Sequence, residues 1–318
     1  MATAVLAPGA YAAVRVSVAT MWAEPTAPRP CDALATADRP DLAGWVAGLD
    51  DAARRDLVGR TLTQLLLGDR VAVEDIADGW ALVAALGQSR SGSDPRGYLG
   101  WVRATHLVRD ETEPADPTYV VTALTTVLNA AGGGAGREAP LGVRLHAVGP
   151  EARGRVPMRV AGSPCPLWAA VDDVAAVTAG EVDTAAVLGL AGRLEGVPYI
   201  WGGLSPQGID CSGLVHLVHR RFGVTLPRDA DDQAAVSRSV EKHGERPGDL
   251  CFFQRPGAVV HHVGFVTAPG RLLHASMSAG RVQYDDVSGE LAATLAGVHR
   301  IAPSRRQAEE TVARDGPG

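Results

Sequence analysis

The sequence predicts an α+β fold in which two small β-barrel domains precede a mixed domain. Short apolar stretches separated by turn residues, which are typical of small barrels, fill two successive parts of the chain. The third part combines a helix that begins near residue 211 with consecutive strands after it, an order typical of an α+β domain. At 318 residues, the chain is long enough for two or three domains.

The first domain is expected at residues 1–110. It opens with a strand between residues 11 and 22 and continues with a helical segment headed by Asp41, in which apolar residues recur on one face. Short strands with Gly and Asp turns then lead to the sequence GWV at residues 100–102. This pattern predicts a small barrel with a helical insertion.

The second domain is expected at residues 111–178, after an acidic linker that contains proline. It again consists of short strands, and a tryptophan lies near the end of both sets, at Trp101 and Trp168. The same type of domain is therefore expected twice, although no residue-by-residue repeat is evident. The α+β domain is expected at residues 179–302, and a polar, disordered tail at residues 303–318.

The composition is that of a globular chain, with 46% hydrophobic and 21% charged residues. A net charge of −6 without a long run of Lys and Arg argues against a nucleic-acid surface. No stretch suits a membrane span, and the N-terminus lacks the basic region of a signal peptide, with Arg15 interrupting its apolar segment. We therefore expect a cytoplasmic protein that binds neither nucleic acid nor membrane.

The four cysteines lie far apart in the sequence, so no zinc-binding spacing occurs. They are Cys31, Cys165, Cys211 and Cys251. We expect no metal and no cofactor.

Cys211 lies at the start of a predicted helix. A glycine- and proline-rich segment precedes it, and apolar residues recur at spacings of three and four after Ser212. The free N–H groups and the positive end of the helix dipole at this position favour a thiolate, the nucleophilic form of cysteine. Most free cysteines are small buried apolar residues. The histidines that follow Cys211 nevertheless favour a catalytic role.

His262 and His274 lie on two predicted strands after this helix. A cysteine nucleophile needs a base, and the base needs a third group that orients it. Because successive side chains of a strand point to opposite faces, only one of His261 and His262 can face Cys211. His262 shares its face with Gly264, which leaves space beside it. We predict that His262 is the base and that His274 orients it.

Six motifs occur in the order that is typical of one peptidase family. YIWGG, DCSGLV, LPRDADDQ, PGDLCFF, HVGFV and LLHAS together resemble the NlpC/P60 family of cysteine peptidases. The resemblance implies a papain-like fold with Cys211 as nucleophile, His262 as base and His274 as third member. It also implies that Tyr199, the tyrosine of the first motif, helps to hold the oxyanion.

The same resemblance implies a set of substrate-binding residues. Asp210 and Ser212, which flank the nucleophile, would line the subsite for the free amine and the neighbouring D-glutamate. Trp201 of the first motif is a further candidate for substrate binding. Ala230 departs from the family pattern, because relatives often carry a hydroxyl residue there. That polar contact would be missing or supplied by Asp229 or Asp231.

The two N-terminal domains resemble bacterial SH3-like domains, with a match at GWV and a departure at PLWAAV (residues 166–171). Two such domains before an NlpC/P60 domain are similar to the γ-D-glutamyl-L-diamino acid endopeptidases. This subgroup acts on peptidoglycan stem peptides with a free N-terminal L-alanine, and the first SH3-like domain overhangs its cleft. Asp69 and Tyr98 are the positional candidates for meeting the ammonium. The expected partners are peptidoglycan-derived peptides, with the diamino acid and the oligomeric state open.

Three alternatives compete with this endopeptidase. A cell-wall hydrolase or amidase acting on intact peptidoglycan would keep the chemistry but need an export signal. An acyltransferase would need an exposed apolar entrance, and no segment suggests one. A wall-binding protein without activity could lose Cys211 or His262, and both are present. The endopeptidase is favoured, and its role in recycling or wall turnover stays open.

Overall fold

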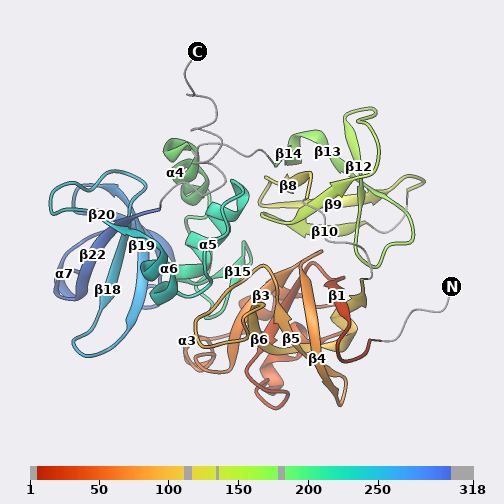
Figure 1. Cartoon of the computed structure of the whole chain (residues 1–318), viewed down its shortest axis with the longest axis horizontal. Helices are drawn as coiled ribbons and strands as arrows, with labels where there is room; N and C mark the ends of the chain where they lie inside the picture. Colours follow the sequence, from red (N-terminus) through yellow and green to blue (C-terminus); the bar gives the residue numbers. More distant parts are fainter. Residues whose placement is uncertain (1–5, 111–116, 134–135, 178–182, 302–318) are drawn as a thin grey trace.

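Three large sheets organise the described part of the chain, two in the N-terminal part and one in the C-terminal part, where a two-stranded sheet is added (Figure 1). The computed structural model describes residues 6–110, 117–133, 136–177 and 183–301. The predicted α+β fold, with two β domains before a mixed domain, is confirmed. The predicted tail at 303–318 lies outside the described residues.

The first sheet has seven antiparallel strands in the order β3-β2-β6-β5-β4-β1-β7. They are β1 (Tyr11–Val14), β2 (Val18–Trp22), β3 (Thr61–Leu66), β4 (Arg70–Ala77), β5 (Trp80–Ala85), β6 (Tyr98–Arg103) and β7 (Leu107–Arg109). Alternate residues of β6 are buried, as expected for a strand with one face on a core. Gly100 lies on this buried face, where a Cβ atom would approach the Met21 side chain to 2.6 Å.

The predicted helical insertion lies between β2 and β3. It consists of η1 (Pro30–Asp32), α1 (Ala33–Thr36), α2 (Leu42–Gly48) and α3 (Asp51–Arg55). Asp41 caps α2 by accepting a hydrogen bond from the Gly44 N–H, which satisfies one of the unpaired donors at the helix start. Trp45 is buried and donates its indole N–H to Asp32 at 2.9 Å.

The second sheet repeats the strand order of the first. Its strands are β8 (Tyr119–Val121), β9 (Thr125–Ala130), β10 (Arg137–Pro140), β11 (Arg144–Ala147), β12 (Arg155–Arg159), β13 (Leu167–Ala170) and β14 (Val174–Ala176). Their order is β10-β9-β13-β12-β11-β8-β14, which equals the first order when each domain is counted from its own first strand. Trp101 and Trp168 therefore lie on equivalent strands, β6 and β13. The structure establishes the repeat that the strand pattern suggested.

The third domain places helices beside an antiparallel sheet of order β17-β22-β18-β19-β20-β21. Its helices are α4 (Thr184–Gly192), α5 (Cys211–Arg221), α6 (Ala230–Val236) and α7 (Gly289–Thr294). Its strands are β15 (Leu204–Ser205), β16 (Gly208–Ile209), β17 (Arg238–Ser239), β18 (Leu250–Gln254), β19 (Val260–Ala268), β20 (Arg271–Ser276), β21 (Arg281–Asp286) and β22 (Leu295–Arg300). The consecutive strands expected after the helix are present as β18 to β21. Helix α5 packs on β19, where the His219 ring stacks on Phe265 with 5.7 Å between centroids.

One hydrophobic cluster spans all three domains. A continuous cluster of buried side chains includes Trp22 of the first domain, Val143 of the second and Leu214 of the third. Packing between the second and third domains is tight, because a Cβ atom on Gly142 would lie 2.5 Å from the Leu217 side chain. The three domains therefore pack directly against one another.

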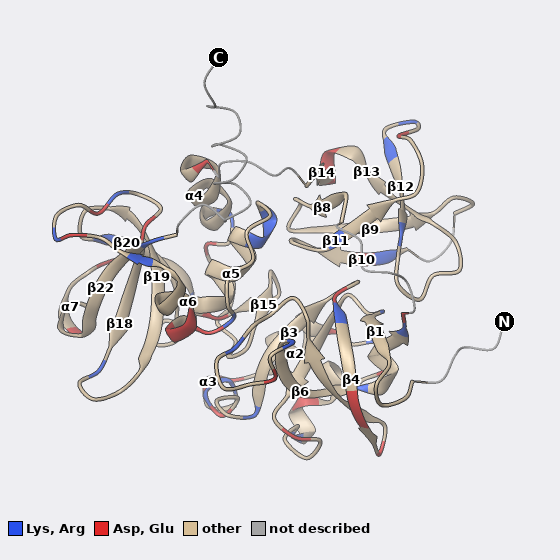
Figure 2. Cartoon of the chain, in the orientation of Figure 1, with Lys and Arg blue, Asp and Glu red and all other residues tan. Residues whose placement is uncertain are grey.

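Acidic and basic residues are interspersed over all three domains (Figure 2). Among the described helices, none combines the length and the apolar character that a membrane span requires.

Arg220, near the end of α5, joins all three domains. Its guanidinium forms an ion pair with Asp69 of the first domain and donates to the Gly142 carbonyl of the second at 3.1 Å. Arg144 of the second domain donates in turn to the Arg220 carbonyl at 2.8 Å. Asp69 also accepts a hydrogen bond from the Leu66 N–H at 2.9 Å. Asp69, the positional candidate for meeting the substrate ammonium, therefore lies at the domain junction, bonded to Arg220, and not among the residues that line the cleft described below.

Replacing Asp69 should destabilise the protein. In Asp69→Ala, the buried Arg220 guanidinium loses its counter-charge, which typically costs about 3–5 kcal/mol. Urea unfolding of the two proteins should show this loss. The control is Asp94→Ala, which removes an exposed ion pair with Arg96 and should change the midpoint little. Equal midpoints for wild type and Asp69→Ala would contradict the proposed importance of the junction.

Candidate active site

Cys211 is the first residue of α5, as predicted. Asp210 caps this helix by accepting a hydrogen bond from the Gly213 N–H at 2.6 Å. The segment before the helix approaches it closely, since a Cβ atom on Gly213 would lie 2.3 Å from the Gly203 carbonyl oxygen. Glycine at both positions therefore lets the loop hold the start of the helix in place.

The Cys211 thiol is buried, and burial controls its charge. Burial raises the pKa of the Cys211 thiol to about 12, and the neighbouring Asp210 carboxylate acts in the same direction. Backbone N–H groups of Val263 and Ser212 favour the thiolate but do not outweigh burial. The expectation that the helix start yields a thiolate is therefore corrected: the resting group is a neutral thiol.

His262 and His274 form a hydrogen-bonded chain that ends at Asp285. Nε2 of His262 lies 2.6 Å from Nδ1 of His274, and Nε2 of His274 lies 2.9 Å from Oδ2 of Asp285. Gln283 donates to the same carboxylate oxygen at 2.7 Å. His261, the neighbour of His262 on β19, is exposed instead. The structure thus joins His262 to His274, the pair selected from the strand pattern.

His262 and His274 are both neutral near pH 7. Burial lowers the pKa of His262 to about 3, and the adjacent His274 acts in the same direction. Burial also lowers the pKa of His274, although its hydrogen bond with Asp285 partly opposes this effect. A neutral imidazole can accept a proton from the Cys211 thiol, so His262 is suited to act as a general base.

A cleft of about 930 Å³ runs between the first and third domains. The sequence-predicted residues that line it are Cys211, His262, His274, Tyr199, Trp201, Asp210, Ser212 and Tyr98. Tyr98 belongs to the first domain, so this barrel contributes a wall of the cleft. Asp69 is the one predicted site residue that the structure places elsewhere.

Tyr199 lies next to Cys211 with its phenol protonated. Its side chain is buried, and burial together with the neighbouring Cys211 raises its pKa well above the usual value. A protonated phenol can donate a hydrogen bond, and Tyr199 lines the same cleft as the thiol. This is the property required of an oxyanion donor.

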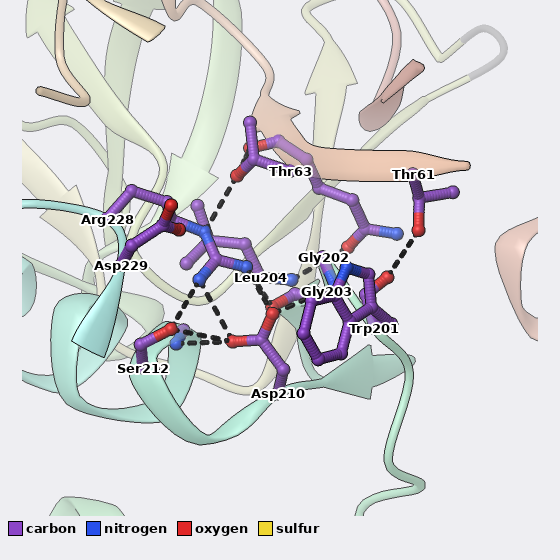
Figure 3. A network of polar contacts seen from close by, with 12 residues as sticks. Thr61, Thr63, Trp201, Gly202, Gly203, Leu204, Asp210, Ser212, Arg228 and Asp229 are labelled. Carbon is purple, nitrogen blue, oxygen red and sulfur yellow. Dashed lines mark hydrogen bonds and ion pairs between the residues drawn. The ribbon is translucent and has the colours of Figure 1, made fainter. Parts of the chain in front are cut away.

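Arg228 occupies the centre of a buried polar network beside the nucleophile (Figure 3). Its guanidinium donates to both carboxylate oxygens of Asp210, at 2.9 and 2.7 Å, and to the Ser212 hydroxyl at 2.9 Å. It also donates to the Gly203 carbonyl at 3.1 Å and to Thr63 of the first domain at 2.8 Å. Asp210 and Ser212 therefore line the cleft while their polar atoms are bonded to Arg228.

The edge strand β3 of the first domain holds the loop that precedes the nucleophile. Thr61 donates its hydroxyl to the Trp201 carbonyl at 2.7 Å (Figure 3). The side-chain oxygen of Gln64 accepts a hydrogen bond from the Leu204 N–H at 2.9 Å. The first domain is thus fixed to the catalytic loop by direct hydrogen bonds.

Asp229 and Arg90 line the cleft next to Tyr98. The Tyr98 hydroxyl donates to Asp229 at 3.2 Å, and Arg90 forms a 3.1 Å ion pair with the same carboxylate. The Arg90 guanidinium also lies 4.8 Å from the centre of the Tyr98 ring. Asp229, which the sequence suggested only as a replacement for a missing hydroxyl, is thus the carboxylate that Tyr98 meets.

Three polar residues of the site were not predicted: Asp285, Arg228 and Arg90. Arg228 lies inside the LPRDADDQ motif, but the sequence alone does not distinguish a buried arginine from an exposed one. Asp285 follows Gln283 at a spacing of two, which places both on one face of β21. This spacing is the one feature of the sequence that indicates that Asp285 and Gln283 act together. Among the described residues, no group of three or more His, Cys, Asp or Glu side chains is arranged to hold a metal ion.

Comparisons with known proteins find one family whose model matches part of the chain. Residues 196–299 match the model of the NlpC/P60 family. Two relatives are named gamma-D-glutamyl-L-lysine dipeptidyl-peptidase: that of Bacillus subtilis (strain 168) is 26% identical and that of Bacillus cereus (strain ATCC 10987 / NRS 248) is 28% identical. The first match covers 84% of this chain and 90% of the relative, and the second covers 85% and 84%.

A solved structure extends the likeness to the complete domain arrangement. The crystal structure of an NlpC/P60 family protein from Bacillus cereus ATCC 10987 is similar with a TM-score of 0.86 at 26% identity. The match covers 92% of this chain and 100% of that chain, so it includes the two N-terminal barrels.

The charge state of Cys211 can be measured directly. Because burial raises the pKa of its thiol to about 12, the group should be protonated at neutral pH and ionise only well above the usual range of cysteine. The ultraviolet difference between wild type and Cys211→Ala should therefore show no thiolate band at neutral pH. A thiolate band there would mean that His262 already holds the proton in the resting protein.

Proposed function

Residues 196–299 are an NlpC/P60 domain, and from this premise we propose that the chain is a cysteine endopeptidase acting on peptidoglycan stem peptides. It hydrolyses the bond between the γ-carboxyl of D-glutamate and the diamino acid, in peptides with a free N-terminal L-alanine. The observation that carries the proposal is the part of the cleft where Tyr98 of the first domain meets Asp229, in the same cleft as Cys211. The names of the two Bacillus relatives support the choice of bond.

The reaction begins with transfer of the Cys211 proton to Nδ1 of His262. The thiolate attacks the γ-glutamyl carbonyl, and the backbone N–H of Cys211 and the Tyr199 phenol stabilise the tetrahedral oxyanion. His262 then protonates the amine of the diamino acid, which leaves. Water, deprotonated by His262, cleaves the remaining thioester and releases the glutamyl carboxylate with regeneration of the thiol.

Asp229 and Tyr98 supply the chemistry for a free amine. The carboxylate can pair with an ammonium, and the Tyr98 hydroxyl can contact the same group. Burial raises the pKa of Asp229, and a substrate cation at this position would favour its ionised form. Arg90 occupies the carboxylate in the structure. It is 44% exposed at its side chain, so it can move into water when the ammonium replaces it.

The fixed position of the first domain favours short peptides over intact cell wall. Thr61, Gln64 and Thr63 bond directly to the catalytic domain, so the Tyr98 wall does not open by separation of the domains. A stem peptide whose alanine is still linked to the glycan would carry an amide and a bulky group toward this wall. We propose that the enzyme acts on released peptides inside the cell, with wall turnover as the alternative role.

The identity of the catalytic residues can be tested by substitution. Cys211→Ala should abolish hydrolysis, because the nucleophile is lost, while Cys251→Ala should retain it. His262→Ala should be inactive, whereas His261→Ala, which alters the exposed neighbour on β19, should keep most of the activity. Mass detection of the two fragments of L-Ala-γ-D-Glu-diaminopimelate, and of the lysine analogue, provides the assay. Full activity of Cys211→Ala would reject the proposed mechanism.

The preference for a free amine should depend on Asp229. Acetylating the alanine removes the ammonium, so its charge-assisted hydrogen bonds with the half-buried Asp229 carboxylate are lost, at a cost of about 1.5–3 kcal/mol. Wild-type kcat/KM for the acetylated tripeptide should therefore fall at least about tenfold. Asp229→Asn should lessen this discrimination.

Asp231→Asn is the matched control for Asp229→Asn. Asp231 lines the same cleft from the same helix start but is exposed, so its replacement should leave the discrimination unchanged. Equal turnover of free and acetylated tripeptide by the wild type would favour a hydrolase of intact cell wall instead.

A further inference from the structure

We propose that Asp285 is a positioning residue that fixes the proton arrangement of both histidines and so directs the basic nitrogen of His262 toward Cys211. The inference rests on the proposed function, because it assumes that His262 is the base. Asp285 lies on β21, at the end of a continuous chain of hydrogen bonds that starts at His262.

Asp285 fixes the proton arrangement of His274. The Asp285 carboxylate can only accept hydrogen bonds when ionised. Partial burial acts to raise its pKa, but hydrogen bonds from His274 and Gln283 outweigh burial, and the pKa lies below the usual value. Asp285 is therefore ionised near pH 7, and Nε2 of His274 must carry the hydrogen of their 2.9 Å contact. Since His274 is neutral, its Nδ1 holds a lone pair.

The proton arrangement of His274 in turn fixes that of His262. Nδ1 of His274 accepts a hydrogen bond, so Nε2 of His262 must donate across their 2.6 Å contact. His262 is neutral as well, and its remaining nitrogen, Nδ1, therefore holds a lone pair that can take the thiol proton. The opposite arrangement would place an N–H on Nδ1 of His262 and leave no base for Cys211. One carboxylate thus selects the productive form of two rings.

Asp285 also stabilises the charge that forms during the reaction. When His262 takes the thiol proton, the pair of rings carries one positive charge in a buried site. The carboxylate at the far end compensates for this charge, in the way that the aspartate of a Ser-His-Asp triad does. Its side chain is 35% exposed, so water can partly replace it. The expected loss is accordingly smaller than for a fully buried triad aspartate.

The test compares two adjacent aspartates of β21. Asp285→Asn should lower kcat about 10- to 100-fold with little change in KM, because the carboxamide removes the charge and can donate as well as accept. Asp285→Glu should restore part of the activity. Asp286→Asn is the control: Asp286 is exposed and points to the opposite face, so activity should be unchanged.

The pH profile separates positioning from a structural role. Asp285 raises the pKa of His274 relative to burial alone, so removing its charge should move the acid limb of kcat/KM to lower pH. Loss of activity without a shift of this limb, or a rise in KM at constant kcat, would overturn the inference.

A second readout does not depend on the substrate. The rate at which iodoacetamide alkylates Cys211 at neutral pH, followed by mass analysis of the Cys211 peptide, should fall in Asp285→Asn and not in Asp286→Asn. If the wild type fails to cleave the tripeptide but this difference is seen, the proposed function fails and the role of Asp285 stands. An unchanged alkylation rate in Asp285→Asn would reject that role.

Discussion

The buried ion pair between Arg228 and Asp210 is the interaction on which the site depends. Asp210 caps the helix that begins at Cys211, and Arg228 occupies both of its carboxylate oxygens. Removing two charges from water is costly unless their hydrogen-bonding groups are satisfied. Arg228 meets this condition partly through Thr63, which belongs to another domain. The position of the nucleophile is therefore set jointly by its own helix and by the first barrel.

Burial has opposite effects on the two reacting groups, and together they define the resting state. It raises the pKa of the Cys211 thiol and lowers that of the His262 imidazole, so neither group is charged before substrate arrives. The charges appear only as the proton moves, at the start of helix α5 and beside the histidine chain. Preorganised dipoles and the Asp285 carboxylate then stabilise charge where it develops, which is the more effective arrangement for catalysis.

The sequence predicts the parts of the site that follow from local periodicity. Cys211 at a helix start and His262 on one face of a strand are decided within a few residues of each position. Asp69 was misplaced because its partner, Arg220, lies 151 positions away, and nothing in the LLGD turn indicates that pairing. Asp285 depends on the register of β20 and β21, where His274 lies opposite Gln283. Tertiary pairing of this kind is beyond a reading of local pattern.

The contacts between strand β3 and the loop from Trp201 to Leu204 also order events during synthesis. The first barrel leaves the ribosome before residue 199 is made, and domains generally fold as units from the N-terminus onward. The loop from Trp201 to Leu204 and the start of helix α5 therefore fold against the surface of a barrel that has already formed. A chain that lacks the first barrel, or whose first barrel is misfolded, has no Thr63 in place as partner for Arg228. Formation of the site around Cys211 therefore depends on correct folding of the first barrel, which also contributes Tyr98 to the cleft.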